Sequence, residues 1–210
     1  MTETFSNSTV FVVDDDPSVR KSLRRLITAA GWTVETFASA DEFLEGTPPH
    51  RPSCLVLDVR LPGLNGLDLQ ERLAQSKSEM PIIFITGHGD IPMSVRAMQA
   101  GAIDFLPKPF EDTALLDAIA RGIEHDRTHR GEQQRLKTIR ARVQSLTPRE
   151  HEVFDLVVTG LLNKQVADQL DISEKTAKVH RARVMQKMRA ESIAELVKLS
   201  QLLQDQTSRG

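Results

Sequence analysis

The chain has 210 residues, of which 27% are charged, and a formal net charge of −2. This is the composition of a soluble globular protein with room for one large or two small domains. The single cysteine, Cys54, excludes an internal disulfide and favours a reducing, cytoplasmic compartment. No apolar run approaches a membrane span and no signal-peptide pattern opens the chain, so we expect no membrane partner.

The small net charge hides an uneven distribution along the chain. Residues 1–124 carry 11 basic and 18 acidic side chains, a net charge of −7. Residues 125–144 carry 6 and 2, a net charge of +4, and residues 145–210 carry 10 and 9, a net charge of +1. We therefore expect only the rear of the chain to meet a polyanion such as nucleic acid.

Five short apolar runs alternate with helical patterns in the front part of the chain. Three of these runs are almost continuously apolar, which is typical of parallel strands covered on both faces. The expected strands are Val10–Val13, Thr33–Phe37, Cys54–Leu57, Ile82–Ile85 and Ala102–Leu106. The first helix begins at Pro17 with Asp16 as its N-cap, and the others fit residues 40–46, 65–75, 92–100 and 112–124. The pattern predicts a doubly wound α/β domain of the (βα)5 type over residues 1–124.

The rear of the chain predicts an all-α domain over residues 145–210. It follows a polar, proline-free linker, residues 125–144, that we expect to be at least partly helical. Thr147-Pro148-Arg149-Glu150 is a capping box. Further helices are expected at Lys164–Leu170 with Asn163 as cap, at Glu174–Met188 with Ser173 as cap, and at about Ser192–Leu203. Two short helices joined by a tight turn, the second rich in base, indicate a helix-turn-helix.

Chemically useful side chains stand where the expected strands end. The triplet Asp14-Asp15-Asp16 follows the first strand, Asp58 follows the third, Thr86 the fourth and Lys108 the fifth. Ligands of open α/β sheets bind at the carboxyl ends of parallel strands. Carboxylates suit a divalent cation, and an ammonium and a hydroxyl suit phosphate oxygens. The sequence therefore predicts a phosphoryl site with a bound cation.

The motifs VVDDD, LDVRLPG-LNG, FITGHGD and FLPKPF over residues 12–109 resemble the receiver domain of bacterial two-component response regulators. The resemblance implies that Asp58 accepts a phosphoryl group from the phosphohistidine of a sensor histidine kinase. It also implies that Asp15, Asp58 and the backbone carbonyl of Arg60 bind Mg²⁺. Asp14 belongs to the same acid pocket, through water.

The same resemblance assigns roles to three other residues. Lys108 pairs with the phosphoryl oxygens, and Pro109 matches a cis-proline position. Thr86 and Phe105 match a switch pair: the Thr86 hydroxyl turns towards the phosphate, and Phe105 fills the space that it leaves. The alternative for Phe105 is a static core aromatic, since apolar aromatics are commonly buried.

The segment 145–203 resembles the LuxR/FixJ-type output domain, so the whole chain resembles a FixJ-type transcriptional regulator. The helical pattern turns Ala177, Val184 and Met188 inward. The resemblance implies binding to duplex promoter DNA, a homodimer when phosphorylated, and contact with RNA polymerase. The expected DNA-binding residues are Lys164, Lys175, Lys178, Val179, Arg181, Ala182 and Arg183, with Arg181 and Arg183 reaching phosphates.

Two other functions compete with this interpretation. A phosphatase of the haloacid-dehalogenase type also uses a nucleophilic aspartate, but it needs a second acid two residues later, where this chain has Arg60. A free receiver, or a receiver with an RNA-binding output, is the other candidate, and the basic helix-turn-helix favours DNA instead. We therefore expect no enzyme beyond self-phosphorylation and slow autodephosphorylation.

Overall fold

The structure is a computed structural model that describes residues 7–46, 51–76, 78–87 and 91–207. The chain forms two compact units, Met1–Arg130 and Gly131–Gly210. The expected linker, residues 125–144, lies within one helix that belongs partly to each unit.

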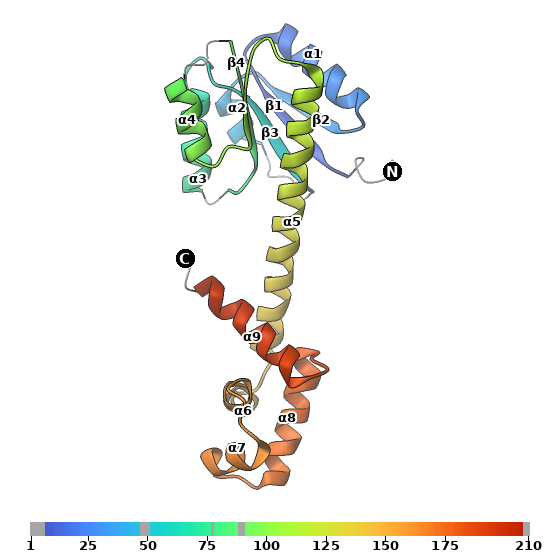
Figure 1. Cartoon of the computed structure of the whole chain (residues 1–210), viewed down its shortest axis with the longest axis vertical. Helices are drawn as coiled ribbons and strands as arrows, with labels where there is room; N and C mark the ends of the chain where they lie inside the picture. Colours follow the sequence, from blue (N-terminus) through green and yellow to red (C-terminus); the bar gives the residue numbers. More distant parts are fainter. Residues whose placement is uncertain (1–6, 47–50, 77, 88–90, 208–210) are drawn as a thin grey trace. The chain divides into compact units, whose positions relative to one another are not determined.

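The first unit is a parallel sheet with helices on both faces (Figure 1). Its strands are β1 (Thr9–Val13), β2 (Thr33–Phe37), β3 (Ser53–Asp58), β4 (Ile82–Thr86) and β5 (Asp104–Pro107). They lie in the order β2-β1-β3-β4-β5. The helices are α1 (Pro17–Ala29), α2 (Ala40–Leu44), α3 (Gly66–Gln75), α4 (Ile91–Gln99) and α5 (Asp112–Gln144). The predicted doubly wound (βα)5 fold is confirmed.

Each strand sends alternate side chains into two separate hydrophobic cores, as the strand period of two requires. Val10 and Val12 of β1 pack with α1 and α5 on one face of the sheet. Phe11 and Val13 pack with α2, α3 and α4 on the other face. Burial on both faces explains why the central strands read as continuous apolar runs.

Helix α3 begins against the end of β3. The Gly66 amide donates to the Val59 carbonyl at 2.9 Å. A Cβ at Gly66 would lie 2.4 Å from the Asp58 carbonyl oxygen, closer than atoms can approach. Asn65 caps the helix by accepting the Asp68 amide. Glycine is therefore required here for close backbone approach.

Helix α5 extends well past the expected boundary at residue 124, into the segment predicted to be partly helical. Ion pairs one turn apart support the polar stretch, such as Arg130 with Asp126. The buried Asp126 carboxylate also accepts the Ser53 amide at 2.8 Å and so fixes α5 to the start of β3. Gly131 is accommodated within the helix, since one glycine costs only about 1 kcal/mol relative to alanine.

The second unit packs the end of α5 with four shorter helices around one hydrophobic core. These helices are α6 (Pro148–Val158), α7 (Asn163–Leu170), α8 (Glu174–Met188) and α9 (Ile193–Thr207). Ala177, Val184 and Met188 are buried, as predicted. The fold class of an α/β domain followed by an all-α domain is thus confirmed.

The cap predicted for α7 is wrong. The helix begins one residue earlier than expected, with Leu162 at the N-cap position and Asn163 as its first residue. The Gln165 side chain accepts the Leu162 amide, which supplies the capping contact. The Asn163 side-chain oxygen instead accepts a hydrogen bond from Arg181 at 3.0 Å. A long-range partner has overridden the local capping preference.

The single cysteine, Cys54, is fully buried in β3. Burial, with a smaller effect of Asp126, raises the pKa of its thiol far above the usual value. Across the described part of the chain, no helix has both the length and the apolar character needed to cross a membrane.

The capping box of α6 also contains a buried ion pair. Glu150 Oε2 accepts the Lys187 ammonium at 2.6 Å and the Thr147 amide at 2.9 Å. The Lys187 hydrogen bond, followed by that of Thr147, lowers the pKa of Glu150 to about 2. Lys187 also donates to the Ser145 carbonyl. One carboxylate therefore joins α8 to the start of α6.

We expect Glu150→Gln to lower the free energy of unfolding at pH 7 by about 1–3 kcal/mol, since a charged hydrogen bond is lost. A carboxylate whose pKa is lowered in the folded state stabilises the protein above its unfolded pKa, near 4.5, and the effect disappears as pH falls towards 2. Urea unfolding followed by circular dichroism at several pH values measures the difference. Glu152→Gln, which removes an exposed pair with Arg149, is the matched control and should change little. A difference independent of pH would contradict the assignment.

Candidate functional site

The ends of four strands bring one set of polar groups together. Asp14 follows β1, Asp58 ends β3, Thr86 ends β4 and Lys108 follows β5. Strands β1 and β3 are neighbours although β2 lies between them in sequence, so the chain changes direction at this point of the sheet. Such a topological switch point is where open α/β sheets bind ligands.

Lys108 is the centre of the site. Its Nζ donates to Asp14 Oδ2 and to Asp58 Oδ2, each at 2.7 Å. Burial alone would lower the pKa of Lys108, but the hydrogen bonds and charges of the two carboxylates outweigh it and the pKa is raised. Burial raises the pKa of Asp14, although its hydrogen bond to Lys108 acts in the opposite direction. The Lys108 amide donates to the Thr86 carbonyl at 2.7 Å, and the Lys108–Pro109 bond is cis, as expected.

Backbone amides hold the remaining carboxylate oxygens. Asp14 Oδ1 accepts the Asp16 amide, and Asp58 Oδ1 accepts the Arg60 amide, each at 2.9 Å. These bonds leave the two buried side chains little rotational freedom. Asp16 caps α1 by accepting the Ser18 amide at 2.7 Å, as predicted.

The acid cluster fits a hard divalent cation. Asp14, Asp15 and Asp58 each offer a carboxylate oxygen, and these oxygens lie within 4.8 Å of one another. Asp14 and Asp58 are buried, whereas Asp15 is exposed. Mg²⁺ prefers oxygen ligands and keeps several of its waters. The side chain of Arg60 is exposed, while its amide contact fixes its backbone beside Asp58.

Sequence reasoning missed Arg20. One guanidinium nitrogen of Arg20 donates to the carbonyls of Asp14 and Asp15, at 2.7 and 2.9 Å. Its place in the first turn of α1 brings it back over the acidic loop. No motif marked this residue, because its partners are backbone oxygens that any sequence provides.

Thr86 and Phe105 lie on adjacent strands. Thr86 is fully buried at the end of β4. Phe105 is half-buried against the core that contains α3 and α4, with its ring centre 6.2 Å from that of Phe84. Phe105 pairs with Phe84 in the strand register, two residues before Thr86, and the switch role of the two residues stays a prediction.

Helix α8 has a buried face and a basic, exposed one. The exposed predicted residues are Lys175, Lys178, Val179, Ala182 and Arg183. Ser173 caps the helix by accepting the Thr176 amide at 3.1 Å, as expected. Asp171, in the turn between α7 and α8, has a left-handed backbone with φ of 51°, which aspartate tolerates better than most residues.

Arg181 differs from its neighbours on α8. Its side chain is half-buried and its guanidinium donates to Asn163, while its expected contact with a DNA phosphate stays a prediction. Lys164, which follows Asn163 in the sequence, is exposed at the start of α7. Arg181 therefore connects the two helices of the helix-turn-helix, and the exposed Leu162 joins the surface beside them.

A parallel (βα)5 sheet whose strand ends carry an acid cluster and a lysine is the arrangement of a receiver domain. Residues 10–120 match the response regulator receiver domain family, and residues 144–200 match the luxR family of bacterial regulatory proteins. The chain therefore belongs to the two-component response regulators with a LuxR-type DNA-binding domain, which are transcription regulators.

Similar proteins match both units together. Nodulation protein W of Bradyrhizobium diazoefficiens is 52% identical over 96% of this chain and 89% of its own length. The transcriptional regulatory protein FixJ of Rhizobium meliloti is 47% identical over 91% of this chain and 94% of its own. The solved low-resolution structure of the response regulator StyR is 52% identical and has a TM-score of 0.86, covering 93% of this chain and 98% of that one.

We expect Asp15→Asn to weaken Mg²⁺ binding by about 10-fold or more, since even outer-shell changes at metal sites cost about 10–100-fold. Calorimetric titration of the unphosphorylated protein measures the affinity. Asp16→Asn is the matched control, because asparagine preserves the cap and Asp16 lies outside the acid cluster. Unchanged affinity in Asp15→Asn would show that its carboxylate is not a ligand.

Proposed function

We propose that this response regulator accepts a phosphoryl group on Asp58 from the phosphohistidine of a sensor histidine kinase. The observation that carries the proposal is the position of Lys108, whose ammonium lies 2.7 Å from Asp58 and from Asp14. A lysine held against a nearly buried carboxylate at a switch point is suited to neutralise a phosphoryl group delivered there.

The transfer exchanges one bond for another. An Asp58 carboxylate oxygen attacks phosphorus, the P–N bond breaks, and the imidazole of the kinase keeps the electron pair. The Lys108 ammonium, already beside Asp58 Oδ2, binds a phosphoryl oxygen. Asp15, Asp58 and the Arg60 carbonyl would hold Mg²⁺, with Asp14 in the same acid pocket, and the ion would supply further positive charge.

A phosphatase of the haloacid-dehalogenase type is a weaker candidate. The second residue after Asp58 is Arg60, an exposed base whose amide, rather than a side-chain acid, contacts Asp58. Without a general acid at this place, phosphorylated Asp58 is expected to be a stable signal that hydrolyses slowly. The protein therefore acts as a phosphoacceptor rather than as an enzyme with turnover.

Incubation with a small acyl-phosphate donor and Mg²⁺ should add one phosphoryl group, and Asp58→Asn should abolish the addition. Mass spectrometry of the intact chain measures it. Asp16→Asn should label like the wild type, because the Asp16 side chain only caps α1. Undiminished labelling of Asp58→Asn would reject Asp58 as the acceptor.

Phosphorylation then changes the receiver surface, through Thr86 and Phe105. The phosphate adds about −1.5 to −2 charges and three strong acceptors, towards which the Thr86 hydroxyl turns while Phe105 moves inward. The adjacent helix α4 carries three exposed apolar residues, Ile91, Val95 and Met98. Their spacing places them on one face of the helix, away from the core. This face supports a phosphorylation-dependent homodimer through α4 and β5.

Phosphorylated wild-type protein should sediment as a dimer and the unphosphorylated protein as a monomer. Val95→Glu, which places a charge in the exposed apolar face of α4, should accept phosphate normally and remain monomeric. Leu44→Glu is the matched control, since Leu44 is an exposed apolar residue of α2. Dimers of phosphorylated Val95→Glu as stable as wild-type dimers would exclude this face.

Two DNA-binding units held in one dimer bind adjacent half-sites with a higher effective concentration. We assign promoter contacts to the exposed face of α8 and to Lys164. The protein acts in the cytoplasm, and RNA polymerase is a further partner. The support is the basic exposed face, with Val179 among the lysines as an apolar contact for a thymine methyl. Arg181 contributes by holding α7 to α8.

Lys178→Ala should weaken specific DNA binding by about 1–3 kcal/mol if Lys178 contacts a base edge. If it contacts only phosphate, binding should fall about equally on all sequences and the salt slope should shrink by about one. Gel shifts on a selected duplex at several salt concentrations separate the two. Lys198→Ala, an exposed lysine of α9, is the control. Wild-type affinity and slope in Lys178→Ala would show that another face meets DNA.

A further inference from the structure

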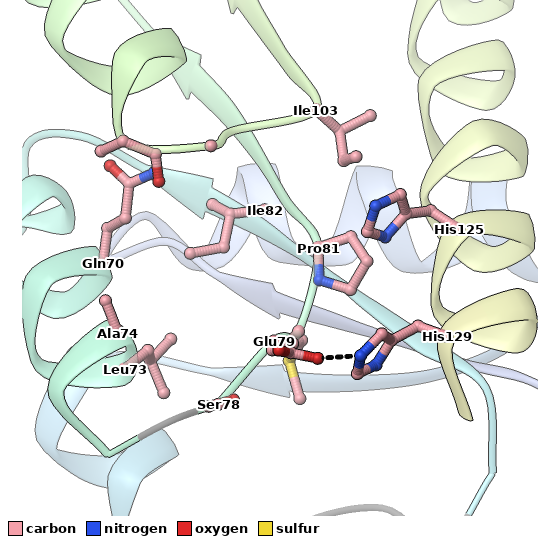
Figure 2. Close-up of a pocket in the computed structure, with 13 residues that line it drawn as sticks. Gln70, Leu73, Ala74, Ser78, Glu79, Pro81, Ile82, Ile103, His125 and His129 are labelled. Atoms are coloured by element: carbon pink, nitrogen blue, oxygen red, sulfur yellow. Dashed lines mark hydrogen bonds and ion pairs between the residues drawn. The ribbon is translucent and has the colours of Figure 1, made fainter. Parts of the chain in front are cut away.

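Two histidines and a glutamate lie together at the opposite edge of the receiver sheet from Asp58. A hollow of about 390 Å³ lies beside the start of β4 and the residues that precede β5 (Figure 2). Its wall is mainly apolar, with Leu73, Pro81, Ile82 and Ile103 among the lining residues. In a parallel sheet this edge holds the amino ends of the strands, whereas the acid cluster lies at the carboxyl ends.

Two imidazoles and one carboxylate enter this hollow. His125 and His129 lie one turn apart on α5, and Figure 2 shows both rings projecting from the same face of the helix. Glu79, which precedes β4, reaches across the hollow and its carboxylate contacts His129 Nε2. Side chains at positions i and i+4 of a helix are neighbours, and two histidines at this spacing are a recurrent zinc-binding pair.

We propose that His125, His129 and Glu79 bind a divalent transition-metal ion, with Zn²⁺ as the best fit. Two imidazole nitrogens and one carboxylate oxygen suit Zn²⁺, which takes three protein ligands and leaves a fourth position to water. Mg²⁺ prefers oxygen ligands, so the two sites of the receiver select different metals. The His129–Glu79 contact already joins two of the three ligands.

The ligand atoms of the three residues do not all lie within 4.8 Å of one another, so binding needs local movements: the Glu79–His129 contact must open to admit the ion, and the His125 ring must turn. In Figure 2 the His125 ring points towards Pro81 and Ile103, while the His129 ring points towards Glu79. His125 is exposed, so its ring is free to turn towards His129 without disturbing the core. The neighbouring cation Arg130 is paired with Asp126, which removes one source of repulsion from the metal.

A metal held by these three residues would connect α5 to the segment before β4. In the structure the contact between the partly exposed side chains of His129 and Glu79 contributes to this connection. Such a pair is weak in water, whereas a bound metal stabilises the folded state according to its concentration and affinity. Zn²⁺ would therefore stabilise the receiver at the amino ends of the strands, whereas the phosphoryl site lies at their carboxyl ends.

The test is calorimetric titration of the full chain with Zn²⁺ in the presence of saturating Mg²⁺, which occupies the acid cluster. We expect one Zn²⁺ per chain, and affinity lowered at least about 10-fold in His125→Gln, His129→Gln and Glu79→Gln. His151→Gln is the matched control, since His151 also lies one turn from a carboxylate, that of Asp155, in α6. All four changes should leave phosphorylation of Asp58 unaltered, which verifies that the variants are folded.

Two further readouts separate this site from the acid cluster. Co²⁺ should give the visible absorption of a four-coordinate ion with nitrogen ligands in the wild type, but not in the histidine variants. Zn²⁺ should raise the unfolding midpoint detected by the single tryptophan, Trp32, in the wild type and in Asp15→Asn. Unchanged Zn²⁺ affinity in both histidine variants, or loss of Zn²⁺ binding in Asp15→Asn alone, would overturn the proposal.

Discussion

The contact of one ammonium with two carboxylates organises the receiver unit. Asp14 and Asp58 are buried side by side at the ends of neighbouring strands, and two like charges there would repel each other strongly. Lys108 lies 2.7 Å from both and compensates them. Because the lysine comes from beyond β5 and its amide is bound by the Thr86 carbonyl, the charge balance depends on β1, β3, β4 and β5 together. We propose that the same lysine binds an incoming phosphoryl group.

Much of this fold could be predicted from local sequence signals. Continuous apolar runs indicated the strands, and the polar residues after four of them were expected to lie together, as they do, because parallel strands end at one edge. The capping roles of Asp16 and Ser173 were also correct, since each depends on residues within three positions. The start of β5 at Asp104 rather than Ala102 shows that strand ends depend on the neighbouring strand, which is not a local property.

The errors and omissions share a physical cause. Asn163 was assigned to a cap, but it accepts a hydrogen bond from Arg181, 18 residues away. The contact of Arg181 with Asn163 was not foreseen, while the assignment of Arg181 to DNA stays a prediction. Arg20 was overlooked because it binds backbone carbonyls. Arg181 has a partner that is distant in sequence, and Arg20 binds backbone carbonyls five and six residues before it, so neither periodicity nor spacing contains that information.

The burial of Cys54 has a practical consequence for attaching probes to the protein. It is the only cysteine in the sequence, its side chain is inaccessible in β3, and its thiol resists ionisation. Thiol reagents attack the thiolate, so the native residue is protected from them while the receiver stays folded. A cysteine introduced at an exposed position would then be the sole reactive thiol. Spin labels or fluorophores can thus be attached in pairs, one per unit, without first removing a native cysteine.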